Sequence, residues 1–254
     1  TVIAVNFIFI IFTFLISAVI ARILIPRILL ISLRKKLFDI PDDRKIHKRA
    51  IPRLGGVSFF PTTLFAFCLV YAFRLLDGDS ISTLYASYLL PELLLFACGM
   101  TLLYLTGIAD DLVGVRYRQK FAIQIFCACL FPLSGLWIND LYGLFGIHEL
   151  SAYVGIPFTV LTVVFITNAI NLIDGIDGLA SGLSSVALLV FTFLFISKGL
   201  WSYAMLSAGT FGVLVPFFYY NVFGSVERAR KIFMGDTGSL TLGYTRSEEH
   251  TSEL

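Results

Sequence analysis

Long, continuous runs of apolar residues dominate the chain, and short polar stretches separate them. A run of about 20 such residues can cross the hydrocarbon core of a bilayer as an α-helix. Membrane β-strands would instead carry apolar residues at every second position, which these runs do not. The pattern predicts an all-α, polytopic membrane helix bundle with about seven complete spans, near residues 5–30, 54–75, 88–109, 119–138, 157–173, 178–197 and 200–222.

The last residues of the chain depart from this pattern. An eighth apolar run begins near Ser239 and turns abruptly polar within a few residues. The final stretch, "RSEEHTSEL", reads like the in-frame translation of a common sequencing adapter. We therefore expect a single transmembrane domain over residues 1–245, truncated at its C-terminal end, and a non-native tail over residues 246–254.

Composition and charge indicate a membrane protein with one basic side. The chain is 57% hydrophobic and only 14% charged, with a mean hydropathy of +0.87, which excludes an ordinary soluble domain. Most of the 19 Lys and Arg residues lie in segments 31–53, 110–120 and 222–236, which the expected spans place on one side. The positive-inside rule assigns that side to the cytoplasm. We expect a multi-pass protein of the inner (plasma) membrane, with its N-terminus outside and its polar motifs on the cytoplasmic face.

The most distinctive polar stretch, "NAINLIDGIDGLASG" at residues 168–182, lies between two apolar runs. Residues three apart are neighbours on a helix, so Asn168, Asn171 and Asp174 can form one polar ridge. The glycines that follow would let the chain break and bring Asp177 to the membrane surface. Such side chains can also join transmembrane helices by hydrogen bonds, but ionisable groups near membrane depth usually mark functional sites.

A second stretch, "GIADDLVGVRYRQK", places two adjacent carboxylates, Asp110 and Asp111, at the end of an apolar run. The C-terminal end of a helix is a poor place for two negative charges, which also repel each other. The pair is either simply solvated or shares a cation or a proton. The basic residues that follow, including Lys120, offer a nearby positive charge.

Two more stretches fall on the same side. In "RKIHKRAIPRLGG", Lys45 and His47 lie between prolines and ahead of two glycines, which suits a phosphate-binding loop as well as a lipid-headgroup anchor. In "FMGDTGSLTLG", the turn at Gly235 and Asp236 can place a carboxylate and free backbone N–H groups beside a phosphate. Phe233 offers a flat face to a base, although aromatic residues beside a span often only pack.

Together these stretches place aspartates, amides and cations on one membrane face. Hard oxygen donors without a cysteine motif favour Mg²⁺, with Mn²⁺ as the alternative, and Mg²⁺ completes its shell with water and phosphate oxygens. The residues therefore indicate Mg²⁺-dependent phosphoryl transfer from a water-soluble diphosphate to a lipid-borne group. A polytopic transporter with intramembrane carboxylates is the alternative from another class, but it would hold them near the bilayer midplane.

The four polar stretches also resemble, in the same order, four successive motifs of the polyprenyl-phosphate N-acetylhexosamine-1-phosphate transferases, which are of glycosyltransferase family 4 type. The resemblance implies a bundle of ten or eleven transmembrane helices. It also implies Mg²⁺-dependent transfer of a sugar 1-phosphate from a UDP-sugar to a polyprenyl phosphate, with release of UMP. The expected partners are these two substrates and the membrane, with no nucleic acid, and a homodimer is the oligomer to consider.

The resemblance implies roles position by position, which complete the set of candidate site residues. The catalytic candidates, which match the family's acidic pair or its polar residues around the nucleotide and metal, are Asp110, Asp111, Asp174 and Asp177. The candidates for binding substrate are Lys45, His47, Lys120, Asn168, Phe233 and Gly235. The positions that match metal ligands are Asn171 and Asp236.

The first loop separates two branches of this family. It ends in "IPRLGG", where the phospho-N-acetylmuramoyl-pentapeptide branch typically has a "TPTMGG"-like ending. The loop looks more like the undecaprenyl-phosphate N-acetylglucosamine-1-phosphate branch, which starts O-antigen, teichoic acid or related cell-envelope glycans. UDP-N-acetylglucosamine is therefore the expected donor, and the muramoyl-pentapeptide is the alternative.

Overall fold

The computed structural model describes residues 2–35, 37, 51–76, 80–141, 143, 146, 148–225 and 230–252. Within these ranges the regular structure is helical and includes no β-strand, so the all-α prediction is confirmed. In chain order the helices are α1 (Val2–Lys35), the 3₁₀-helix η1 (Gly55–Ser58), α2 (Phe59–Leu76), α3 (Ser80–Val113), α4 (Tyr117–Ser134), α5 (Ala152–Ile173), α6 (Leu179–Ser197), α7 (Trp201–Val222) and α8 (Gly235–Ser252).

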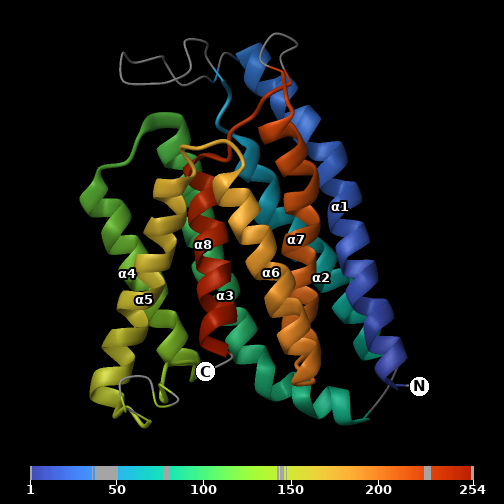
Figure 1. The fold of residues 1–254 in the computed structure, drawn as a ribbon, viewed down its shortest axis with the longest axis vertical. Helices are drawn as coiled ribbons and strands as arrows, with labels where there is room; N and C mark the ends of the chain where they lie inside the picture. Colours follow the sequence, from blue (N-terminus) through green and yellow to red (C-terminus); the bar gives the residue numbers. More distant parts are fainter. Residues whose placement is uncertain are drawn as a thin grey trace.

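Most of the helices run roughly along the long axis of the molecule and form two neighbouring groups, and the first part of α3 crosses the lower end (Figure 1). In one group, α1, α2 and α6 surround α7, and the contact between α1 and α7 is the most extensive in the bundle. In the other group, α8 packs mainly against α5 and α3, and α4 covers both of these. Each group therefore has one central helix, α7 or α8.

Six helices of the described chain are long and apolar enough to cross a membrane. They provide the spans Ala4–Lys35, Gly55–Leu76, Leu89–Val113, Ala152–Ile173, Leu179–Ser197 and Trp201–Val222. The remaining expected span, at residues 119–138, is occupied by α4, which has 18 residues and is not among the six. Arg118 and Lys120 lie in its first turns and reduce its mean hydropathy.

The central helix α8 is polar in sequence but almost entirely buried up to Glu248. It begins at Gly235, earlier than the expected start near Ser239. Its hydroxyl groups donate hydrogen bonds back along the helix, for example from Thr241 to the Thr237 carbonyl at 2.7 Å and from Ser247 to the Gly243 carbonyl at 2.8 Å. Because these groups are satisfied within the helix, burial of α8 leaves few polar atoms without a partner.

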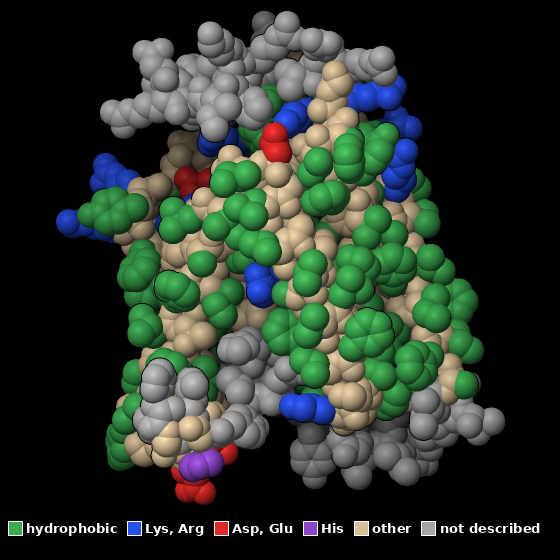
Figure 2. All heavy atoms as spheres, viewed as in Figure 1, with side chains coloured by type: hydrophobic (Ala, Val, Ile, Leu, Met, Phe, Trp, Pro, Cys, Tyr) green, Lys and Arg blue, Asp and Glu red, His purple; other side chains and the backbone are tan. Residues whose placement is uncertain are grey.

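Apolar side chains cover much of the visible outer surface along the helices, whereas most of the visible Lys and Arg side chains lie toward the upper end (Figure 2). The exposed apolar residues include Phe165 on α5, which is 71% exposed, and Phe193 on α6, which is 70% exposed. Exposed apolar surface of this extent is typical of a face that contacts membrane lipid. The chain is therefore a multi-pass membrane protein with its charged residues near one end of the bundle.

The polar stretches that the structure describes meet at that upper end (Figure 1). There α3 ends, α4 begins, α5 ends at Ile173, α6 begins at Leu179 and α8 begins. The chain break between α5 and α6 was expected, and Gly178 supports it with a φ of +74° that other residues rarely adopt. The gathering of the motifs is thus confirmed for three of the four stretches. Lys45 and His47 lie outside the described residues.

Candidate functional site

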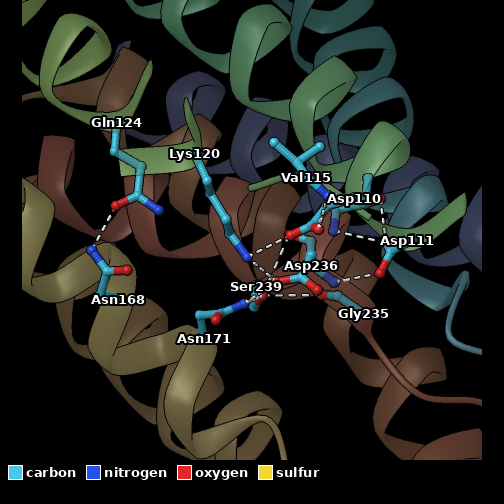
Figure 3. Close-up of polar contacts among 11 residues, drawn as sticks. Asp110, Asp111, Val115, Lys120, Gln124, Asn168, Asn171, Gly235, Asp236 and Ser239 are labelled. Atoms are coloured by element: carbon cyan, nitrogen blue, oxygen red, sulfur yellow. Dashed lines mark hydrogen bonds and ion pairs between the residues drawn. The ribbon is translucent and has the colours of Figure 1, made fainter. Parts of the chain in front are cut away.

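Polar side chains from four helices converge at the upper end of the bundle (Figure 3). Their sources are the last turn of α3, the first turn of α4, the last turn of α5 and the first turn of α8. The side chains are those of Asp110, Asp111, Lys120, Asn171 and Asp236. Helix ends are positioned by the packed spans beneath them, so residues far apart in the sequence are brought within hydrogen-bonding distance.

Lys120 lies at the centre of this group. Its ammonium is 2.8 Å from Oδ2 of Asp110 and also contacts Oδ1 of Asp236. The three side chains are shielded from solvent, with exposed fractions of 15% for Lys120, 14% for Asp110 and 25% for Asp236. Oδ1 of Asp110 accepts a hydrogen bond from the backbone N–H of Val115 at 2.8 Å. One lysine thus neutralises carboxylates from α3 and α8, which the sequence places 126 residues apart.

Asn171 connects α5 to the same carboxylate. Its Nδ2 donates to Oδ1 of Asp236 at 2.6 Å and to Oγ of Ser239 at 2.8 Å. The Ser239 hydroxyl in turn donates to the Gly235 carbonyl at 3.0 Å. Asn171 and Asp236, the two predicted metal ligands, are therefore adjacent, and the Oδ1 atom of Asn171 and the Oδ2 atom of Asp236 take no part in these bonds.

Asp111 caps the start of α8, although it belongs to α3. Its carboxylate accepts hydrogen bonds from the backbone N–H groups of Asp236 at 2.8 Å and Thr237 at 2.9 Å, and from the Thr237 hydroxyl at 2.6 Å. The first N–H groups of a helix have no partner within the helix, and a carboxylate there also interacts favourably with the helix dipole. These N–H groups were expected to be free for a phosphate. That expectation is wrong for Asp236 and Thr237.

Gly235 lies between the Arg53 backbone and the Asp111 carboxylate and has a φ of +75°. A side chain at this position would overlap the Arg53 carbonyl oxygen and would place its Cβ 2.8 Å from both carboxylate oxygens of Asp111. The backbone of Gly235 also donates a hydrogen bond to Asp174. Only glycine fits between these groups, and the predicted role of Gly235 in substrate binding remains a prediction.

The segments before η1 and before α8 run alongside each other. The Phe233 N–H donates to the Pro52 carbonyl at 2.8 Å, and the Gly55 and Gly56 N–H groups donate to the carbonyls of Phe233 and Met234 at 2.9 and 2.8 Å. The two glycines that close the first loop are therefore part of the support of α8. Phe233 is partly buried at this junction, and its predicted stacking on a base remains a prediction.

Two predicted residues of the 168–182 stretch lie at the edge of this group. Asp177, in the turn before α6, forms an ion pair with Lys231. Asn168 lies one turn before Asn171, and its Nδ2 donates to Oε1 of Gln124 on α4 at 2.6 Å. The polar ridge predicted for α5 therefore exists, but its two asparagines face different partners on α4 and α8.

Several uncharged polar residues help to hold the site together, and they were not predicted as site residues from the sequence. Gln124 is 3% exposed and contacts Asn168, and Asn221 is 4% exposed and binds both the Gly178 N–H at 2.7 Å and the Ile232 carbonyl at 3.0 Å. A polar residue inside an apolar run was the only available signal for both. Ser239 and Thr237 lay within a motif, but their partners could not be read from it.

Negative charge exceeds positive charge around Asp236. Burial raises the pKa of Asp174 to about 8, and the nearby carboxylates of Asp236 and Asp111 also raise it. A hydrogen bond from the Gly235 backbone acts in the opposite direction. The described residues contain no group of three or more His, Cys, Asp or Glu side chains placed to hold a metal. Mg²⁺ needs only one or two protein ligands. The oxygen donors of Asn171 and Asp236, in an acidic setting, fit such an ion when a substrate phosphate supplies further ligands.

Known proteins provide an independent comparison. The profile of the family described as "Glycosyl transferase family 4" matches residues 93–247. A Bacillus subtilis (strain 168) protein named "Probable undecaprenyl-phosphate N-acetylglucosaminyl 1-phosphate transferase" is 32% identical over 239 residues, covering 94% of this chain and 61% of the relative. An Escherichia coli (strain K12) protein, "Undecaprenyl-phosphate alpha-N-acetylglucosaminyl 1-phosphate transferase", is 30% identical over 217 residues, covering 82% of this chain and 53% of the relative.

A third relative carries a different name. A Staphylococcus carnosus (strain TM300) protein named "Phospho-N-acetylmuramoyl-pentapeptide-transferase" is 31% identical over 253 residues, covering 92% of this chain and 72% of the relative. The chain thus spans 61% of the length of the Bacillus relative and 53% of that of the Escherichia coli relative. The family profile covers more than half of the chain and includes three of its four polar stretches. The chain therefore belongs to glycosyl transferase family 4.

Proposed function

We propose that the protein transfers N-acetylglucosamine 1-phosphate from UDP-N-acetylglucosamine to polyprenyl (undecaprenyl) phosphate and releases UMP. The observation that carries this proposal is the group formed by Asp110, Lys120, Asn171 and Asp236 at one end of a membrane bundle. Such a group offers metal-binding oxygens and a phosphate-binding ammonium where a soluble and a lipid-borne substrate can meet. The names of two relatives contain both undecaprenyl phosphate and N-acetylglucosaminyl 1-phosphate transferase.

In the proposed reaction, an oxygen of the lipid phosphate forms a bond to the β-phosphorus of the UDP-sugar. The bond from that phosphorus to the bridging oxygen breaks, and UMP leaves with the bonding electrons. A phosphate monoester has a second pKa of about 6, so the acceptor is already an anion at neutral pH. The reaction therefore needs no general base, and catalysis consists mainly of alignment and charge stabilisation.

The residues of the site supply these two functions. A bound Mg²⁺ would stabilise negative charge on the phosphate oxygens, with Asn171 and Asp236 as its protein ligands. Lys120 can exchange one of its carboxylate partners for a phosphate oxygen and so bring positive charge to the transferring group. Asp111 keeps its bonds to α8 and fixes the position of Asp236. Asp111 is then a positioning residue rather than a proton acceptor.

The proposed site lies on the cytoplasmic face of the inner membrane, because the basic residues gather at the same end and the positive-inside rule assigns that end to the cytoplasm. α1 begins at the opposite end of the bundle (Figure 1), so the proposed orientation would have the N-terminus outside. A transporter is less well supported, since the carboxylates lie at helix ends rather than near the middle of the spans.

The direct test is a transfer assay in membranes that contain the protein, with radiolabelled UDP-N-acetylglucosamine, polyprenyl phosphate and Mg²⁺. We expect label in the lipid fraction, stoichiometric UMP, and loss of both when EDTA removes the metal. Membranes from cells without the protein serve as the control. If no UDP-sugar that is tested gives lipid-linked label, the proposed function is wrong.

The muramoyl-pentapeptide donor is the second candidate, because one relative carries that name. The "IPRLGG" ending of the first loop favours N-acetylglucosamine, so UDP-N-acetylglucosamine should outcompete UDP-muramoyl-pentapeptide when both are present. A preference for the pentapeptide in this competition would assign the protein to the other branch.

A further inference from the structure

A pair of amide side chains lies beside the group around Lys120 and has no role in the mechanism above. Gln124 belongs to α4 and Asn168 to α5, and Asn168 donates to Oε1 of Gln124 at 2.6 Å. Gln124 is 3% exposed, although it lies on a helix whose neighbouring residues are mostly apolar. Burying a carboxamide is unfavourable unless its hydrogen-bonding groups find partners.

The hydrogen bonds of this pair leave the amide nitrogen of Gln124 without an acceptor among the described residues. Both hydrogens of Asn168 Nδ2 are used, one by Gln124 and one by the Val164 carbonyl at 2.8 Å. Gln124 uses only its oxygen, so its two N–H groups have no acceptor among the described residues. In Figure 3 this nitrogen lies on the side of the pair that faces Lys120. The structure thus holds a nearly buried hydrogen-bond donor that points toward the site.

The pair lies deeper in the bundle than the charged group. Gln124 follows Lys120 by four residues along α4, which runs away from the site end, and Asn168 precedes Asn171 by three residues along α5, which runs toward it. At about 1.5 Å of rise per residue, both amides lie roughly 5 Å farther from the upper end. A group bound there would be between the metal-binding residues and the interior of the membrane.

We propose that Gln124 binds the phosphate group of the lipid acceptor, with its amide nitrogen donating to a phosphate oxygen that Lys120 also contacts. The inference rests on the proposed function and specifies which substrate binds on which side. The acceptor enters from the bilayer, so its phosphate reaches the site from the deeper side, whereas the soluble donor enters from the upper end. Asn168 is a positioning residue that holds the Gln124 carboxamide in place.

Charge explains why an amide suits this position. A phosphate next to Asp110 and Asp236 is repelled by both carboxylates, and Lys120 compensates only part of that repulsion. A second buried cation would add attraction but would be costly at this depth. A neutral donor avoids that cost and still supplies a hydrogen bond to a charged acceptor, which is stronger than one between neutral groups.

Two substitutions separate binding from a purely structural role. Gln124→Glu keeps an oxygen that accepts from Asn168 but replaces the donor by negative charge, whereas Gln124→Met keeps the length and removes both functions. Gln119→Glu adds the same charge on the same helix at an exposed position that contributes no side chain to the site, so it is the matched control. A purely structural role predicts that both Gln124 variants lower the unfolding midpoint without ligand, since Glu buries a charge and Met loses the bond to Asn168, and that the shift caused by a ligand is unchanged.

The first measurement is the shift in thermal unfolding of the purified protein at pH 8 with farnesyl phosphate, farnesol or inorganic phosphate as the probe. We expect stabilisation by farnesyl phosphate alone, retained in Gln119→Glu and lost in both Gln124 variants. An equal shift for Gln124→Glu and the unsubstituted protein would overturn the assignment. An equal shift with inorganic phosphate would instead indicate an anion site without a lipid requirement, which also overturns it.

The second measurement is steady-state transfer with each substrate varied in turn. Gln124→Met should raise KM for polyprenyl phosphate by at least about tenfold, the equivalent of one hydrogen bond to a charged group, and leave KM for the UDP-sugar nearly unchanged. An equal rise in both KM values, or a fall in kcat alone, contradicts the inference. If the unsubstituted protein transfers no sugar phosphate at all, the proposed function fails, and the farnesyl phosphate shift still tests the site by itself.

Discussion

α7 and α8 occupy comparable places, each at the centre of one group of helices, but different interactions hold them there. The buried surface of α7 is largely apolar, and Val213, Leu214 and Phe217 belong to one core cluster with residues of α1 and α6. α8 buries Thr237, Ser239 and Thr241 just as completely. Its start is fixed by hydrogen bonds to Asp111 and Asn171.

This difference separates stability from activity. Apolar packing has no strong directional preference, so a helix held by it can adjust to a small change while its neighbours repack. Hydrogen bonds depend steeply on distance and angle, so a helix start held by three of them has a narrowly defined position. We therefore expect substitutions in α7 to lower stability and substitutions at the start of α8 to lower transfer.

Asp236→Asn should have the largest effect, a loss of transfer on the order of 1000-fold, because it removes the negative charge that a hard cation requires from the start of α8. The measurement is the initial rate of lipid labelling across a Mg²⁺ titration. Asp140→Asn, in the segment between α4 and α5 at the opposite end of the bundle, is the control and should be unaffected. Unchanged Mg²⁺ dependence in Asp236→Asn would show that the metal is held elsewhere.

Gly235→Ala should lower transfer by about 100-fold, since a displacement of about 1 Å in aligned groups has effects of that size. The new Cβ overlaps the Arg53 carbonyl and presses on the Asp111 carboxylate. Gly199→Ala is the matched control, because Gly199 has a nearly identical φ of +74° with no atom within 4 Å of its Cβ position. Equal losses in the two variants would attribute the effect to backbone strain alone.

Asp111→Asn should reduce transfer by roughly tenfold. The uncharged amide has one accepting oxygen in place of the two that bind the donors of α8, and it loses the favourable interaction with the helix dipole. Thr237→Val, which removes one of the three donors, should give a smaller loss. A double-mutant cycle measures the coupling between them. Strict additivity would mean that Asp111 acts without α8, contrary to its positioning role.

Leu214→Ala should have the smallest effect on transfer and a clear effect on stability. Leu214 is completely buried in α7, and such truncations typically cost about 2–5 kcal/mol. We expect a lower midpoint of thermal unfolding but transfer per folded molecule within about twofold of normal. A large fall in kcat without a change in the unfolding midpoint would mean that α7 also positions the site, and the contrast between the two helices would fail.

The apolar runs were sufficient to predict the helices, because the transfer of a side chain from water to lipid is a property of that residue and of its immediate neighbours. The interruption of the apolar runs predicted the break between α5 and α6, and the polar stretches indicated the end of the bundle at which the site forms. The prediction was less accurate for α4, whose basic first turns make it shorter and more polar than the six spans.

The sequence by itself determined the membrane bundle, the family resemblance through four motifs, and the residue types of a phosphate and metal site. Only the tertiary structure decided which carboxylate faces which partner: Asp111 is directed to the start of α8, and Lys120 is held between Asp110 and Asp236. Only the structure showed that Gln124, which lies outside the four motifs, contacts Asn168 beside the site. Helix formation in the apolar runs follows from local composition. The burial of the polar helix α8, and a hydrogen bond between residues 126 positions apart, depend instead on how whole helices pack.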